Sequence, residues 1–140
     1  MNSRRLLMIL SLLGFSLSTN FALAAQKNPQ MRTCYILKGQ FFVAESATDQ
    51  FGFCKFGSAI IGTIDLVRYQ QLRETVLSIQ TYQNNIKSCA PFGLTEKLIT
   101  PDGYEVSVCA FEDGSMIESE TLRLGTHAIE NAYLNEALEE

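Results

Sequence analysis

The sequence predicts an α+β fold: two related small antiparallel β units, each closed by a disulfide, with a long connecting helix and a C-terminal helix. Three observations predict it. Cys34 and Cys54 enclose nineteen residues, Cys89 and Cys109 enclose nineteen more, and the second pair repeats the first at an offset of 55. Each pair lies among short runs of strand-forming residues bounded by turn residues. A helical pattern separates the two pairs.

The first 24 residues predict a signal peptide. Arg4 and Arg5 precede an uncharged apolar run from Leu6 to Leu17, and small residues close the segment. This run is shorter than the roughly 20 residues that cross a bilayer, so we expect no stable membrane anchor. Cleavage near Ala24 or Ala25 would leave a secreted or periplasmic protein.

The first cysteine-paired repeat is expected at residues 25–66. Asn28-Pro29 is a typical helix start, and Gly39 is placed to end that helix. The strands that follow are predicted at 41–43, 51–56 and 59–64, with turns at 46–50 and 57–58.

The connecting helix is expected at residues 67–87. Helical periodicity itself extends over residues 65–86, with Asp65 as a candidate N-cap. The apolar stripe consists of Leu66, Tyr69, Leu72, Val76, Ile79 and Ile86. Such a stripe predicts a helix that covers the protein's own sheet, and a homodimer through the 65–86 helix is the alternative.

The second cysteine-paired repeat is expected at residues 88–125, and the C-terminal helix at 126–140. Gly125 and Thr126 read as a helix stop and a new cap. The strands of this repeat are predicted at 94–99, 104–111 and 116–121, with a turn at 100–103.

The two repeats preserve the facing of their strand residues as well as their spacing. Cys54 shares a strand face with Phe56, as Cys109 does with Phe111. Apolar residues also occupy the opposite face, which predicts strands covered on both sides. On that face Phe51 and Phe53 match Val106 and Val108.

The chain without residues 1–24 is acidic. Nine basic residues then stand against 15 acidic ones, a formal charge of −6. This charge repels phosphate backbones and anionic lipid headgroups, so we expect neither nucleic acid nor a lipid surface as the partner.

The four cysteines have two chemical interpretations, disulfides and a zinc site. Structural zinc ligands usually come in close pairs, and these cysteines are widely spaced, so disulfides are favoured. Four cysteines allow three pairings, among which the repeat favours Cys34–Cys54 with Cys89–Cys109.

No residue cluster specifies a reaction, and we expect no catalytic residues, metal site or cofactor. His127 is the single histidine, so a histidine-based hydrolase would have to rely on this one residue. Asp102, Glu112 and Asp113 lie in predicted turns, where acidic residues are common for backbone reasons. An enzyme is therefore the least favoured class.

A family resemblance rests on the residues around each cysteine pair. The first copy carries Asn28-Pro29, Cys34, Gly39, Cys54-Lys55-Phe56-Gly57 and Asp65-Leu66, and the second carries residues 109–115. Over residues 28–66 and 89–125 the chain resembles a small bacterial envelope domain of unknown function that is labelled a hemolysin. The label implies membrane lysis, and the family has no agreed mechanism.

Architecture and compartment together predict a protein-binding module. Its loops at 45–51, 100–104 and 112–115 are expected to meet a protein partner of unknown identity. A secreted, hemolysin-like lytic factor is the alternative, although the acidic charge opposes its binding to anionic lipid.

Overall fold

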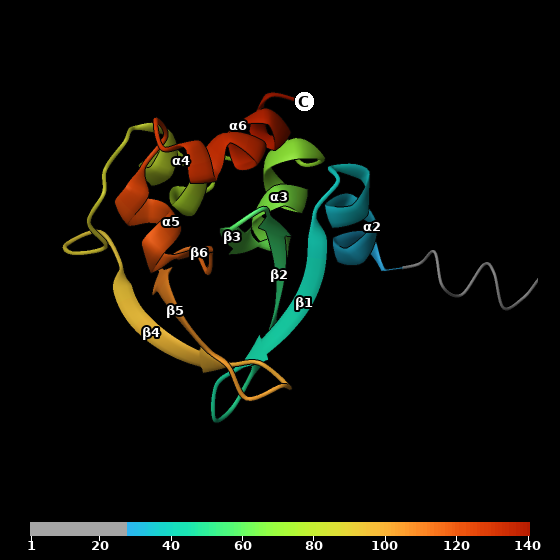
Figure 1. Cartoon of the computed structure of the whole chain (residues 1–140), viewed down its shortest axis with the longest axis vertical. Coiled ribbons are helices and arrows are strands. Elements are labelled where there is room, and N and C mark those ends of the chain that lie inside the picture. Colours follow the sequence, from blue (N-terminus) through green and yellow to red (C-terminus); the bar gives the residue numbers. More distant parts are fainter. Residues whose placement is uncertain (1–27) are drawn as a thin grey trace, which may run out of the picture.

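The computed structural model describes residues 28–140, so the expected signal peptide and its cleavage site lie outside the described residues. Six strands form one closed antiparallel barrel in the order β1-β2-β3-β6-β5-β4 (Figure 1). They are β1 (Gln40–Glu45), β2 (Gln50–Phe56), β3 (Ala59–Gly62), β4 (Leu94–Ile99), β5 (Glu105–Ala110) and β6 (Met116–Glu118). The mixed fold is confirmed, and all six strands share one barrel.

Two junctions of the barrel consist of a single residue pair each. Ile61 of β3 lies opposite Ile117 of β6, and Glu45 of β1 lies opposite Ile99 of β4. The other neighbouring strands form ladders of three to six residue pairs, as in the β1–β2 hairpin. Figure 1 shows β1 and β4 converging where they meet and diverging towards the helices.

Helices cover the barrel, with α2 beside β1 and the others gathered at one end (Figure 1). They are α2 (Pro29–Ile36), α3 (Thr63–Gln70), α4 (Leu77–Gln83), α5 (Ser119–Leu124) and α6 (Ala132–Glu139), with a 3₁₀ turn at Ile129–Asn131. The predicted start of α2 is confirmed, because the Asn28 side chain accepts hydrogen bonds from the amides of Gln30 and Met31. No helix in the described part of the chain is long and apolar enough to cross a bilayer.

The two strand faces build two separate apolar clusters, as the alternation predicts. One cluster fills the barrel and takes a residue from every strand: Ala44, Phe53, Ile60, Leu98, Val106, Val108 and Met116. The other lies between the barrel and the helices, and its members include Cys54, Phe56, Cys109 and Phe111. The barrel wall is therefore apolar on both sides.

The single helix expected over 65–86 does not form. The chain makes α3 and α4, separated by residues 71–76, and Arg73 has a positive φ of 55°. The reversal lets both halves of the apolar stripe reach the same core, since Leu66, Val76 and Ile79 are all buried there. One straight helix would have carried the second half away from the barrel.

The third strands are shorter than expected. β3 ends at Gly62 rather than Ile64, and β6 ends at Glu118 rather than Thr121. The strand prediction for 119–121 was wrong because Thr121 is needed over β3, where its hydroxyl accepts a hydrogen bond from the Ile60 amide at 3.0 Å. Helix α5 provides that position and buries Leu122 in the core.

Candidate functional site

An open groove of about 840 Å³ lies beside β1. Residues 40–43 of β1 form one wall, and residues of the 100–104 turn form the other. Tyr35 of α2 and Tyr104 stand at its margins, and their side chains are 57% and 72% exposed. Large aromatic side chains beside an apolar hollow are typical of surfaces that bind a partner.

The floor of the groove reaches the barrel interior. Ile60 and Val106 line it and belong to the cluster that fills the barrel. Phe42 stacks on Phe53 with ring centroids 5.6 Å apart, so the β1 wall is held by the same cluster. Lys55 also lines the groove and supplies a positive charge. The site is thus an apolar hollow whose floor belongs to the barrel core and whose lining includes one cation, Lys55, and one carboxylate, Asp102.

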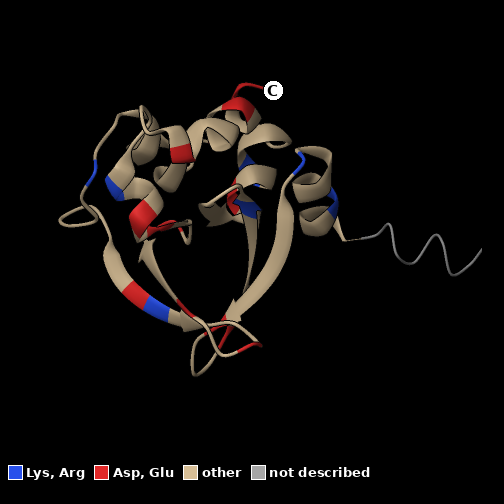
Figure 2. Cartoon of the chain, in the orientation of Figure 1, with Lys and Arg blue, Asp and Glu red and all other residues tan. Residues whose placement is uncertain are grey.

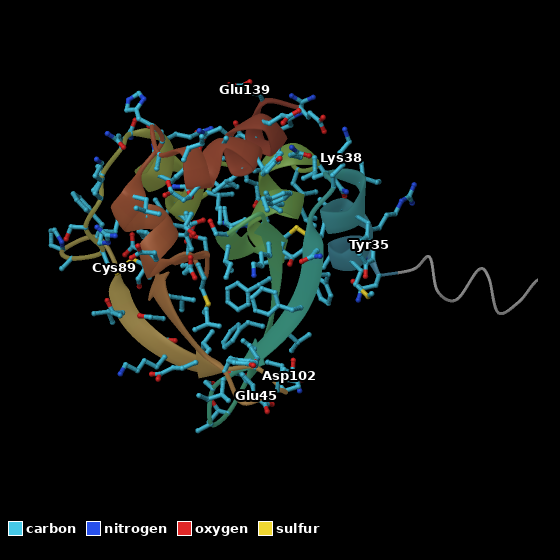
Figure 3. All side chains as sticks on the ribbon, viewed as in Figure 1. Tyr35, Lys38, Glu45, Cys89, Asp102 and Glu139 are labelled. Carbon is cyan, nitrogen blue, oxygen red and sulfur yellow. A yellow bond between two sulfur atoms is a disulfide. The ribbon has the colours of Figure 1, made fainter. Side chains whose placement is uncertain are left out.

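The groove exists because β1 and β4 touch only at their ends. Continuing the antiparallel register beyond Glu45 and Ile99 would place the 100–104 turn, not β4, opposite the rest of β1. Pro101 in that turn has no amide to donate to a ladder. In the view of Figure 3, Glu45 and Asp102 both lie at the end of the barrel where β1 and β4 converge, while the groove beside residues 40–43 stays open.

The structure contains both disulfides in the favoured pairing. Cys34–Cys54 and Cys89–Cys109 each join residues 20 positions apart, with Cα atoms 5.6 and 5.5 Å apart. Every cysteine of residues 28–140 is bonded. Disulfides of this kind are typical of an oxidising compartment outside the cytosol.

The three loops expected to meet a partner have different roles. The 100–104 turn lines the groove, and the 45–51 loop lies beside it, because Glu45 pairs with Ile99. The 112–115 turn is tied inward: Asp113 accepts hydrogen bonds from the Leu77 amide and from Ser115. His127 is exposed and stands apart from the groove-lining residues.

The structure buries one aspartate, Asp65, that the sequence did not predict to be buried. Asp65 is not an N-cap but lies within α3, fully buried, where one carboxylate oxygen accepts hydrogen bonds from Ser78 Oγ at 2.6 Å and the Met116 amide at 2.9 Å. Its other oxygen has no hydrogen-bond partner among the described residues. Nothing in the local sequence distinguishes this aspartate from a surface one.

Burial raises the pKa of Asp65 to about 7, although the hydrogen bonds from Ser78 and Met116 lower it. Nearby Asp113 raises this pKa further, and Arg68 opposes that effect. Ser78 is itself fully buried, so a substrate has no direct access to its hydroxyl. The Asp65–Ser78 pair therefore links α3 to α4 rather than forming an exposed nucleophile.

The groove residues were also missed, although the sequence holds a signal for them. Phe41, Phe42 and Val43 occupy the strand positions that Thr95, Glu96 and Lys97 occupy in the second hairpin. Both triplets begin at the partner of a bonded cysteine, Phe41 opposite Cys54 and Thr95 opposite Cys109. Comparing the copies position by position would have singled out the apolar triplet.

Comparison with protein-family models, with curated proteins and with solved structures gives no match. The resemblance to the hemolysin-labelled envelope domain therefore stays a prediction.

Proposed function

We propose that the protein is a binding module of the cell envelope or the secreted fraction, and that it holds a protein partner in the groove between β1 and the 100–104 turn. The observation that carries this proposal is the groove itself, with two exposed tyrosines over an apolar floor. Aromatic anchors beside an apolar pocket are the usual energetic centre of a protein interface.

The compartment is part of this proposal. Two disulfides in 113 described residues favour an oxidising environment, which supports export by the expected signal peptide at residues 1–24. In this view the protein meets its partner in the periplasm or outside the cell. No observation favours the lytic alternative over a binding role.

We also infer that the barrel consists of two copies of one unit related by an approximate two-fold axis. Its support comes from the two single-pair junctions. Ile61 and Ile117 are the β3 and β6 residues opposite Cys54 and Cys109, and they pair with each other. Glu45 and Ile99 each lie four residues beyond the opposite-strand partner of a cysteine, and they also pair.

The duplication bears on function because the groove lies among features that the two copies do not share. Each copy has its disulfide and a glycine packed against it, Gly39 in the first and Gly93 in the second. Helix α2, with Tyr35, contains the first cysteine of the first copy, whereas residues 86–93 around Cys89 in the second copy contain no helix. The groove is lined by Tyr35 of α2, a helix that only the first copy has.

Site-specific photocrosslinking in the producing cells tests the proposal. A photoreactive amino acid is placed at Tyr35, at Tyr104 and, as a control of similar exposure on α6, at Tyr133. We expect positions 35 and 104 to trap the same protein and position 133 to trap none of it. Equal trapping at all three positions, or none at 35 and 104, would show that the groove is not the binding site.

A further inference from the structure

We propose that the groove takes an extended polypeptide segment as an additional β-strand along the free edge of β1. This inference rests on the proposed binding function and specifies its mode: main-chain hydrogen bonds to Phe41 and Val43 hold the segment, and the apolar groove receives its alternate side chains.

The first support is the direction of the β1 amides. The Ser46 amide donates to the Asp49 carbonyl at 2.9 Å, which makes this the hydrogen-bonded pair closing the hairpin. Antiparallel pairs alternate, so Glu45, Val43 and Phe41 direct their main-chain groups away from β2. Glu45 meets Ile99 on that side. Among residues 28–140, Phe41 and Val43 have no strand beside them there.

The second support is that the equivalent edge on β4 is protected and the β1 edge is not. Thr95, Glu96 and Lys97 are all exposed, and charged residues on an edge strand discourage pairing with another chain. The β1 edge instead carries Phe41 and Val43, both only partly exposed. Of these two equivalent edges, only the apolar edge of β1 therefore has the features of a site that pairs with another strand.

The third support is the negative charge at one end of the groove, which favours a basic residue in the added segment. Acidic residues gather where β1 and β4 converge (Figure 2). Glu45 and Glu105 both pair with Ile99 there, Asp49 lies in the turn after β1, and Lys97 is the basic residue of β4. Lys97 is already engaged by Glu105 at 3.2 Å. A basic residue at the end of the segment that passes this tip would meet an unbalanced negative field.

The occupant is therefore an extended segment of a partner protein, with alternating apolar side chains and a basic residue near one end. A second copy of this chain would offer a β1 strand, Gln40–Glu45, that contains no basic residue, and it is one of the outcomes that the test distinguishes. The main-chain groups of Phe41 and Val43 point to an edge with no neighbouring strand in residues 28–140, so an extended backbone can pair with both, which a helix cannot do.

Selection of random displayed peptides on the oxidised protein tests this mode. The decisive variant is Val43→Pro, which deletes an amide that points to the open edge and removes no bond of the β1–β2 ladder. The matched control is Val43→Thr, which keeps the amide and the branched shape. We expect Val43→Pro to weaken the selected peptides at least about tenfold and Val43→Thr to leave them within about twofold.

Hydrogen exchange on the unsubstituted protein gives a readout that does not depend on the variant folding. Bound peptide should protect the amides of Phe41 and Val43. Strand addition would be overturned if the selected peptides bind Val43→Pro normally, fail to protect these two amides in the unsubstituted protein, and lose affinity for Tyr104→Ser. That result would leave the groove as a protein-binding site. Failure to select any peptide, or protection of the same amides by dimerisation without peptide, would also overturn it.

Discussion

Ser78 Oγ lies 2.6 Å from Asp65 Oδ2, although thirteen residues separate the two along the chain. In one continuous helix those residues would be about 20 Å apart. The short contact is possible because the chain reverses between α3 and α4, and it holds the buried carboxyl whose pKa is raised to about 7. The Met116 amide binds the same oxygen, so the contact also ties β6 to both helices.

The first prediction is that Asp65 makes the protein less stable as the pH rises towards neutrality. Its pKa is about 7 in the folded state against 3.8 for an ordinary aspartate, so the folded state binds the extra proton between these values. The free energy of unfolding should fall across this window, by at most about 1.4 kcal/mol per pH unit from this group. Urea denaturation at several pH values measures it.

Asp65→Asn isolates this contribution. The amide keeps an acceptor for Ser78 and Met116 but does not titrate, so the variant should gain stability relative to the natural protein as the pH rises from about 4 to 7. Asp49→Asn, at an exposed hairpin turn, serves as the control. Parallel stability curves for Asp65→Asn and the natural protein would contradict the prediction.

The sequence predicts the strands well because their signals are local. The 94–99 strand was predicted with its observed bounds, and the Asn28-Pro29 start of α2 and the cysteine faces are confirmed. Barrel closure depends on two single-residue junctions, Ile61 with Ile117 and Glu45 with Ile99, and no local pattern encodes a contact between residues more than 50 positions apart.

The helix over 65–86 shows the other kind of error. Its period is helical throughout, but Leu72, in the middle of the apolar stripe, is 60% exposed. Tertiary contacts decide the outcome, since Asp113 binds the Leu77 amide and Ser115 binds the Ser78 amide at the start of α4. The groove was missed for a related reason: it arises from the absence of a β1–β4 ladder.

The second prediction is an order of reduction for the disulfides. Cys34, Cys54 and Cys109 are fully buried, whereas Cys89 is only partly buried. A mild reductant should therefore open Cys89–Cys109 first, because thiol exchange needs access to a sulfur atom. Alkylation under native conditions, followed by peptide mass spectrometry, gives the order. Labelling of Cys34 and Cys54 before Cys89 would refute it.

The third prediction concerns the glycine beside the first disulfide. A methyl group at Gly39 would collide with Cys54 Sγ and lie 2.9 Å from a Phe56 ring carbon. Gly39→Ala should lower the free energy of unfolding by about 2 kcal/mol or more, because neither neighbour can move freely in the core. Chemical denaturation of the oxidised protein measures this loss.

A protein that lacks the first disulfide distinguishes crowding by its sulfur atoms from a general backbone effect of Gly39→Ala. In a Cys34→Ala/Cys54→Ala protein both sulfur atoms are gone, so most of the Gly39→Ala cost should disappear. Gly103→Ala is a further control, since a methyl group there meets nothing within 4 Å and only its positive φ is unfavourable. An unchanged Gly39→Ala cost in the cysteine-free background would exclude crowding by the disulfide.

The fourth prediction is that Asp113 has the opposite pH dependence to Asp65. Burial opposes its ionisation, but hydrogen bonds from the Leu77 amide and from Ser115 outweigh burial and lower its pKa. The stability it contributes is present above the unfolded pKa near 4 and is lost as the pH falls through the lower, folded value. Asp113→Asn should cost about 1–2 kcal/mol at neutral pH, because the amide cannot accept at both oxygens. Denaturation curves should show that cost shrinking in acid, whereas a cost independent of pH would mean that the carboxylate charge is not what holds the 112–115 turn to α4.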